Sequence, residues 1–326
     1  MKKTMKTAVA LAVLATPAFA ANLENPLYLP KAGDVYSKTG VGVMYKIADD
    51  TPAQKLKNHD GATEFPIWRL AEDLGYGITD RLAIQGSFGY TYDGDINRKG
   101  LHQGRLGAIY RILAETQPFV LDVYADAHIG GLSKMTGRAT LHSLTVTSFT
   151  FDNYGTGQYG VWGGFRAGKT WDKLTGSVFA EVGHFFANDN SKINVDSTFN
   201  PLLVGDAVAK IKAYTDWNIG TKWSYDFAPK WTSGFGFAWK HHSNHVVDSA
   251  KSDSALLTSK VIPGFNNKDL KDGFNEFAVS LSVANELSDT VQIALYGEYT
   301  FDNGQDGSQN STDVKAELGV RLNAQF

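Results

Sequence analysis

Four consecutive polar residues at the end of an aromatic run have the composition of an acyl-transfer site. They are His241, His242, Ser243 and Asn244. A serine hydroxyl becomes a nucleophile when a neighbouring base takes its proton, and a third group must orient the imidazole of that base. In an extended segment, His241 and Ser243 point to the same face. Asn275, on the expected neighbouring strand, is the candidate for the third group.

This stretch resembles the H-x-S-N motif of two outer-membrane hydrolase families, phospholipase A and the eight-stranded lipid A 3-O-deacylase. The resemblance implies that His241 is a general base and Ser243 a nucleophile on an outer wall near the outer leaflet. The chain departs from both families at His245, where they carry a small residue, and Asn275 lies beyond a long loop. Glu276 is expected to face inward, unlike the acidic partner of the deacylase. The alternative is a polar strand end that leads into a hydrophilic loop.

Charged side chains recur at every second position of several long stretches. Near the C-terminus, Val314 and Leu318 alternate with Lys315, Glu317 and Arg321. Such runs exceed the five or six residues of a usual strand and match the ten or so that a tilted membrane strand requires. Because a charge that faces hydrocarbon is costly, the charged faces are expected to surround a lumen. The expected pore-lining residues are Arg69, Asp73, Arg105, Arg111, Asp122, Asp126, Arg166, Glu181, Lys222, Lys240, Glu298, Lys315, Glu317 and Arg321.

Two interpretations of this lumen remain open. The charges line a water-filled, mildly selective pore, or they pair across a narrow barrel and close it. Glycines on the inner register, such as Gly75, Gly164 and Gly319, remove side-chain bulk and favour open space. Glu72 is an exception, because it falls among apolar residues on the lipid-facing register. We expect a local bulge to turn it inward.

The alternating stretches predict an all-β fold, a closed antiparallel transmembrane barrel. Tight turns alternate with long polar stretches, which is typical of barrels that cross an outer membrane. We expect twelve strands, and a count of fourteen would absorb the alternating stretch 141–151, which we interpret as a hairpin above the membrane. The expected strands lie near 40–48, 66–77, 82–92, 102–113, 119–130, 158–171, 174–187, 211–226, 231–243, 274–287, 291–301 and 313–326.

The two ends of the chain complete a resemblance to the Gram-negative outer-membrane β-barrels as a class. Residues 1–20 have a lysine-rich start, a short apolar stretch and an A-x-A site, which predicts a secretory signal peptide cleaved at Ala20. Residues 21–39 are an expected periplasmic segment that either hangs free or folds back as a partial plug, and residues 40–326 form the barrel. The resemblance implies that Phe326, a terminal aromatic residue, is read by the outer-membrane assembly machinery.

Composition excludes several other functions. The 326 residues carry a net charge of −3 and no cysteine. The charge argues against a nucleic-acid partner, and the missing thiols exclude disulfides, zinc–thiolate sites and thiol catalysis. His241, His242 and His245 lack good metal-ligand spacing, so no metal and no cofactor is expected.

The sequence therefore favours a porin-like, non-enzymatic protein of the outer membrane, surrounded by membrane lipid and lipopolysaccharide, that passes small hydrophilic solutes or ions. The alternatives are a lipid acyl hydrolase that uses His241 and Ser243, and a structural or adhesion barrel.

Overall fold

The computed structural model is all-β. It describes residues 22–48, 67–93, 98–114, 116–130, 135–142, 145–152, 158–196, 205–253, 268–271, 273–306 and 309–326. Among these residues, no helix is long and apolar enough to cross a membrane.

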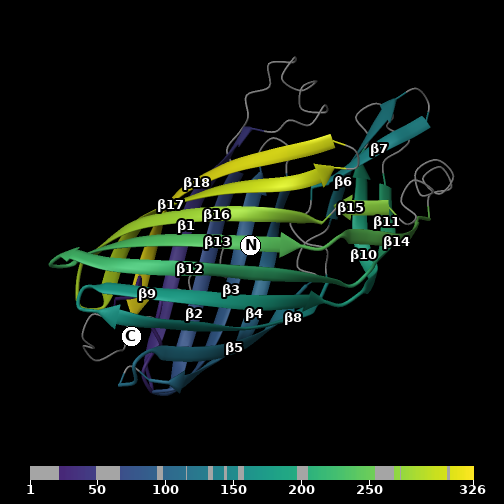
Figure 1. Cartoon of the computed structure of the whole chain (residues 1–326). Helices are drawn as coiled ribbons and strands as arrows, with labels where there is room; N and C mark the ends of the chain where they lie inside the picture. The colour runs from purple at the N-terminus through teal and green to yellow at the C-terminus, as the bar shows by residue number, and fades with distance from the viewer. Residues whose placement is uncertain are drawn as a thin grey trace, which may run out of the picture.

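Twelve antiparallel strands of the described chain close into a barrel (Figure 1). Around the ring they follow the order β1, β18, β17, β16, β13, β12, β9, β8, β5, β4, β3 and β2. Their bounds are β1 Val35–Ala48, β2 Ile67–Thr79, β3 Leu82–Asp93, β4 Arg98–Leu113, β5 Val120–Ile129, β8 Gly160–Trp171, β9 Leu174–Phe185, β12 Tyr214–Ala228, β13 Trp231–His242, β16 Phe274–Glu286, β17 Val291–Asp306 and β18 Gln309–Gln325. The predicted closed twelve-stranded barrel is thus confirmed. The seam closes where β1 pairs with β18, and Val35 and Phe326 exchange two backbone hydrogen bonds of 2.8 Å.

The outer face of the wall is apolar. Successive strand residues alternate between exposed and covered, and Leu281, Leu295 and Leu318 expose 59%, 62% and 64% of their surface. Ala284 and Ala294, on the opposite register, are fully buried. A continuous apolar surface of this kind is typical of a barrel whose wall faces hydrocarbon. Exposed Trp171 and Tyr225 lie at the turn ends of their strands, where amphipathic rings suit a membrane interface.

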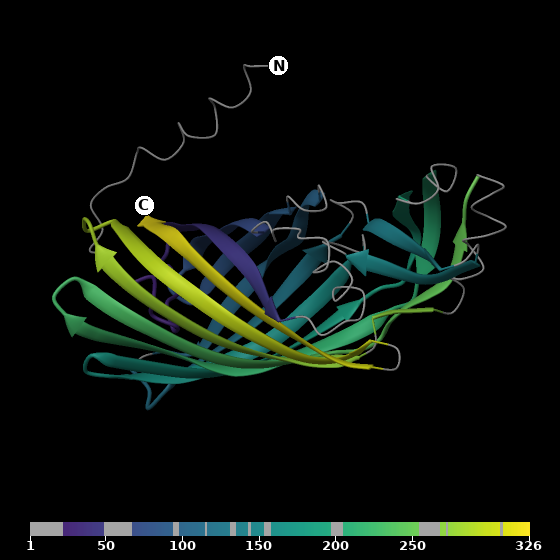
Figure 2. The ribbon, with the colours of Figure 1, turned by 90° about the horizontal axis from the view of Figure 1, so that it is seen from above.

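All connections at one end of the barrel are short, whereas the other end carries the longest connections together with the two-residue link between β17 and β18. The turns β2–β3, β8–β9 and β12–β13 leave only two residues between strands, such as Asp172 and Lys173. The start of β1 and the end of β18 meet at this turn end, as Figure 2 shows by the position of the C-terminus. We use "turn end" and "loop end" for the two mouths of the barrel.

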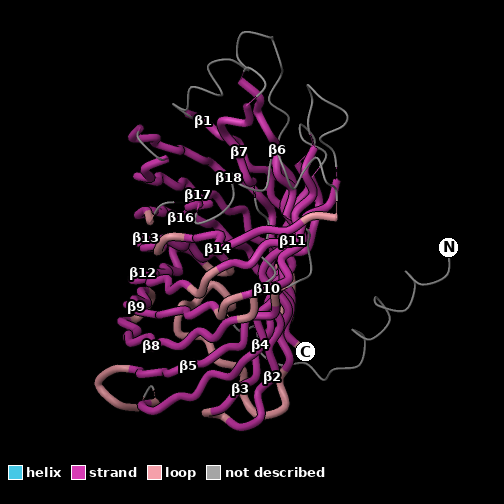
Figure 3. Tube along the Cα trace, turned by 90° about the vertical axis from the view of Figure 1, so that its right-hand side faces the viewer, coloured by secondary structure: helices cyan, strands magenta, loops and turns pink. Residues whose placement is uncertain are grey.

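A second sheet extends the barrel at the loop end (Figures 1 and 3). Its order is β15, β14, β11, β10, β6 and β7, and β10 pairs with β6 in parallel. The bounds are β6 Met135–His142, β7 Thr145–Asp152, β10 Asn188–Asp196, β11 Gly205–Ile211, β14 His245–Lys251 and β15 Lys268–Lys271. The hairpin expected at 141–151 is β6 and β7 of this sheet and does not join the barrel wall. The other four strands of this sheet lie between residues 188 and 211 and between residues 245 and 271.

Two expectations about β1 and β2 were wrong. β1 begins at Val35, five positions before the expected start at residue 40. No bulge turns Glu72 inward, because β1 and β2 pair in unbroken register from Val35 to Met44. Glu72 instead stays on the outer register and accepts hydrogen bonds from the hydroxyls of Ser37 (2.6 Å) and Thr39 (2.5 Å). These two donors, on the neighbouring strand, satisfy the carboxylate where it stands.

Candidate functional site

The residues predicted to line a lumen lie on the inner register, opposite the exposed apolar set, and many of them pair. Arg69 on β2 and Glu317 on β18 form an ion pair of 2.6 Å that crosses the intervening strand β1. The crossing point is Gly42, since a Cβ there would lie 2.5 Å from a Glu317 carboxylate oxygen. Tyr296 on β17 donates to the same carboxylate at 3.0 Å. A continuous set of polar contacts therefore spans four neighbouring strands, β2, β1, β18 and β17.

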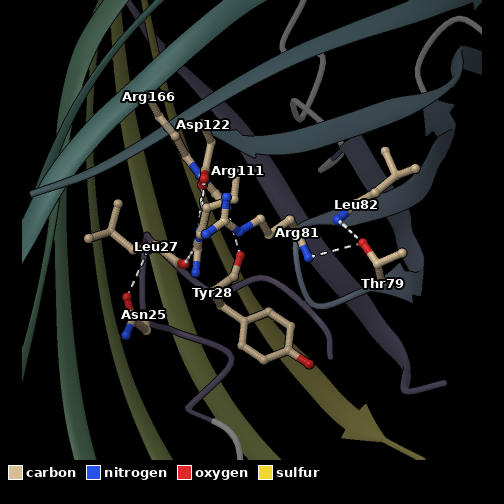
Figure 4. A network of polar contacts seen from close by, with 9 residues as sticks. All are labelled: Asn25, Leu27, Tyr28, Thr79, Arg81, Leu82, Arg111, Asp122 and Arg166. Atoms are coloured by element: carbon tan, nitrogen blue, oxygen red, sulfur yellow. Dashed lines mark hydrogen bonds and ion pairs between the residues drawn. The ribbon is translucent and has the colours of Figure 1, made fainter. Parts of the chain in front are cut away.

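A second network joins β4, β5 and β8 (Figure 4). The side chain of Asp122 is fully buried and accepts two hydrogen bonds from Arg111, at 2.8 and 3.1 Å. Its second oxygen also accepts from Arg166 at 2.7 Å. Two cations therefore share one carboxylate, so the cluster carries an excess of positive charge.

The remaining predicted residues spread over the rest of the inner wall. Lys240 binds Glu276 at 2.7 Å, Glu181 accepts from Tyr124 and Asn218, and Asp126 accepts from Gln85. Arg105 lies over the ring of Trp162, 4.1 Å from its centroid, and Lys222 lies over Phe179. The side chains of Asp73, Glu298 and Lys315 belong to the same inner register of their strands. The inner wall is thus crossed by short-range pairs and by cation–ring contacts.

The inner glycines do not leave open space, contrary to our expectation. A Cβ on Gly319 would lie 2.4 Å from the Tyr296 ring, and one on Gly75 would lie 2.1 Å from the Tyr36 ring. The rings of Tyr124 and Trp162 cover Gly164 and Gly183 in the same way. These glycines accommodate aromatic rings of neighbouring strands. We did not predict these aromatic rings on the inner wall from the sequence. The signal for them was that Tyr124, Trp162 and Tyr296 occupy the polar register of their strands.

Residues 22–34, which we call the N-terminal segment, lie inside the turn end of the barrel. They bond to strands spread around the ring: β1, β2, β4, β8, β12, β13, β16 and β18. A segment of this length reaches so many strands of a closed ring only from within. Leu23 and Leu27 are 1% and 2% exposed. Of the two places that the sequence allowed for this segment, the structure has the folded-back one.

Glu24 is a central contact of the N-terminal segment. Its carboxylate accepts from Arg321 at 2.5 Å, from Asn323 at 2.9 Å and from Ser282 at 2.9 Å. Burial acts to raise the pKa of Glu24, but the charges of Arg321 and Lys38 and the hydrogen bonds outweigh it and hold the pKa at about 2. The segment is therefore fixed to β16 and β18 through an ionised carboxylate.

The candidate hydrolase residues are only partly brought together. His241 and Asn275 face each other across β13 and β16, with 3.1 Å between His241 Nδ1 and Asn275 Oδ1. Ser243 Oγ accepts a hydrogen bond from the Thr215 backbone N–H at 2.9 Å, and no hydrogen bond joins its described side chain to His241. A nucleophile and its base require that contact. Within the described residues, no group of three or more His, Asp or Glu side chains is placed to hold a metal ion.

Comparison with known proteins supports the fold. No protein-family model matches the chain, and no curated protein sequence matches it. The chain is similar in structure to an outer membrane channel from Pseudomonas putida F1, with a TM-score of 0.58, 11% identity, and coverage of 95% of this chain and 100% of the channel. The CymD monoaromatic hydrocarbon channel matches with a TM-score of 0.44, 10% identity, and coverage of 91% and 89%. At 11% identity, the likeness to the Pseudomonas putida channel supports the barrel fold and nothing finer.

Proposed function

We propose that this protein is an outer-membrane channel for the passive passage of small hydrophilic solutes or ions. The observation that carries the proposal is the contrast between the two faces of one closed wall. The outer face exposes a belt of leucine, valine and aromatic side chains, while the inner face holds the charged residues. Pore-lining charges and pore width govern conduction through the pore that such a wall encloses. The Pseudomonas putida relative, which is an outer membrane channel, adds support.

The orientation proposed for the chain follows from its two ends. We infer that a signal peptide is removed after Ala20, that the turn end faces the periplasm and that lipopolysaccharide surrounds the loop end. Phe326 is proposed to be recognised by the assembly machinery, and its backbone bonds to Val35 place it at the closing seam. N-terminal sequencing of the protein purified from outer membranes tests the cleavage site.

The inner wall is proposed to set ion selectivity. Twelve strands lie between the eight that side chains fill and the sixteen that leave a wide channel. Paired charges such as Arg69 and Glu317 reduce the net field along the wall, so a weak selectivity is expected. The hydrolase alternative has the expected His241–Asn275 contact but lacks the Ser243–His241 contact that a nucleophile and its base require, so we favour the channel.

The test is single-channel recording in planar lipid bilayers. The mature chain, refolded and inserted, is expected to give discrete current steps in 1 M KCl, and the shift of reversal potential in a salt gradient measures selectivity. A heat-denatured sample serves as the control. A barrel that passes no current, both as the wild type and with residues 22–34 deleted, would refute the channel and favour a structural or adhesion role.

A further inference from the structure

Four cations of the barrel wall bond to the N-terminal segment. Lys38 Nζ donates to the carbonyl oxygen of Leu23 at 2.7 Å, and Arg321 binds the carboxylate of Glu24. On the other side of the ring, Arg111 and Arg166 donate to successive carbonyl oxygens of the segment.

Figure 4 shows both of these arginines converging on the segment, at Leu27 and Tyr28. Each of the four cations thus donates a hydrogen bond to one oxygen atom of the segment. Charge-assisted hydrogen bonds of this kind are stronger than bonds between neutral groups.

The segment is not built into the sheet. None of residues 22–34 belongs to a strand, so no ladder of backbone bonds anchors the segment along its length. It joins β1 just after Gly33, whose φ of +90° lies in the left-handed region that favours glycine. The segment turns back into the lumen at this point. The backbone carbonyls of Pro30 and Lys31 then pass directly over Gly77 of β2.

We propose that the N-terminal segment is a displaceable plug, and that its oxygens occupy a site for carboxylate-bearing solutes. This inference rests on the proposed channel function. Without the segment, Lys38, Arg111, Arg166 and Arg321 would face the lumen at the turn end. On the described wall, Asp122 lies between the first two arginines and Asp73 lies opposite Lys38, so the four cations outnumber these two carboxylates. A solute with carboxylate groups supplies the oxygens that these cations lose. The tethered segment competes with such a solute for the same four cations.

Gly77 offers a way to displace the plug without changing any charge. A Cβ on Gly77 would lie 1.8 Å from the Lys31 carbonyl oxygen and 2.8 Å from that of Pro30. Gly77→Ala is therefore expected to push the segment out of the turn end and to raise single-channel conductance severalfold. The matched control is Gly163→Ala in β8, because the nearest atom to a Cβ there is a backbone oxygen 3.8 Å away. The control is expected to conduct like the wild type.

A disulfide that holds the segment in place, which we call the lock, tests the displacement of the plug from the opposite direction. The chain has no cysteine, so an introduced pair reacts without competition. Asn22 Nδ2 donates a hydrogen bond to Thr232 Oγ1 at 3.3 Å, so the double variant Asn22→Cys and Thr232→Cys places its two thiols on residues whose side chains are in contact. Oxidation is expected to hold the channel at its lowest conductance, and reduction to restore the wild-type current. Equal conductance for the oxidised lock, the wild type and Gly77→Ala would overturn the plug.

Citrate is the probe for the site itself, and glucose is the neutral control. Millimolar citrate on the turn side is expected to block the current of Gly77→Ala, whereas glucose is not. Adding Arg166→Gln should weaken this block about tenfold, since one charge-assisted hydrogen bond is lost. If citrate and glucose act alike on an open Gly77→Ala channel, the carboxylate site is refuted while the channel stands. If no variant conducts, the proposed function fails.

Discussion

Glu24 connects the N-terminal segment to the wall through a charge, which makes the attachment sensitive to pH. The pKa of Glu24 is about 2 in the folded chain, against an ordinary value of 4.5. A carboxyl group whose pKa is depressed on folding stabilises the fold fully above its unfolded pKa. That contribution is lost as the pH falls from 4.5 through 2. Arg321, Lys38 and Asn323 are the groups that maintain the depression.

The free energy of unfolding is therefore expected to fall across this window by about 3 kcal/mol through Glu24. Guanidinium titrations of the protein in lipid vesicles at pH 6, 4 and 2.5 measure it. Other carboxyl groups titrate in the same range, so the comparison is with Glu24→Gln, which retains the shape of the side chain without its charge. The difference in stability between the two proteins should shrink toward low pH. A difference that is constant with pH would contradict the assigned pKa.

At the scale of the elements, alternation predicted the barrel strands well because lipid and lumen impose opposite demands on successive residues. The strand that starts at Leu174 and the one that starts at Trp231 begin where the sequence places them. The second sheet could not be found in this way. β10, Asn188–Asp196, is largely polar, and one of its partners is β6, a strand of a different loop. The pairing of distant loops leaves no local period in the sequence.

Aromatic rings over glycines are a second feature of the elements, and they make a specific prediction. Gly319→Ala in β18 places a Cβ 2.4 Å from the ring of Tyr296, whose hydroxyl also donates to Glu317. The ring must shift, and overpacking of this kind costs about 1–3 kcal/mol. Gly86→Ala in β3 is the control, since its nearest neighbours would lie at 3.5 and 3.7 Å. Denaturant unfolding should show a loss for the first variant and almost none for the second. Equal stability of the two would mean that the ring is not confined.

At the scale of the whole molecule, the sequence indicated the charged lumen but not what fills it. Arg111, Asp122 and Arg166 were expected to line a pore, and they do lie together on the inner wall. Their bonds to Leu27 and Tyr28 join residues that are far apart in the chain, so no periodicity could reveal them. Glycines in the inner register suggested space because sequence spacing does not show which ring crosses from the next strand.

At the scale of the whole barrel, a substitution at Phe326 can distinguish an effect on folding from an effect on assembly in the outer membrane. Its backbone N–H and carbonyl oxygen close the seam with Val35, and Phe326→Ala retains both groups. The variant is therefore expected to fold into lipid vesicles as fully as the wild type, as measured by the shift in gel mobility between unheated and boiled samples. In cells, the yield in the outer-membrane fraction should fall severalfold, because the terminal ring is the proposed assembly signal. Equal yields would remove that role from Phe326, and a failure to fold in vesicles would mean that the ring itself stabilises the seam.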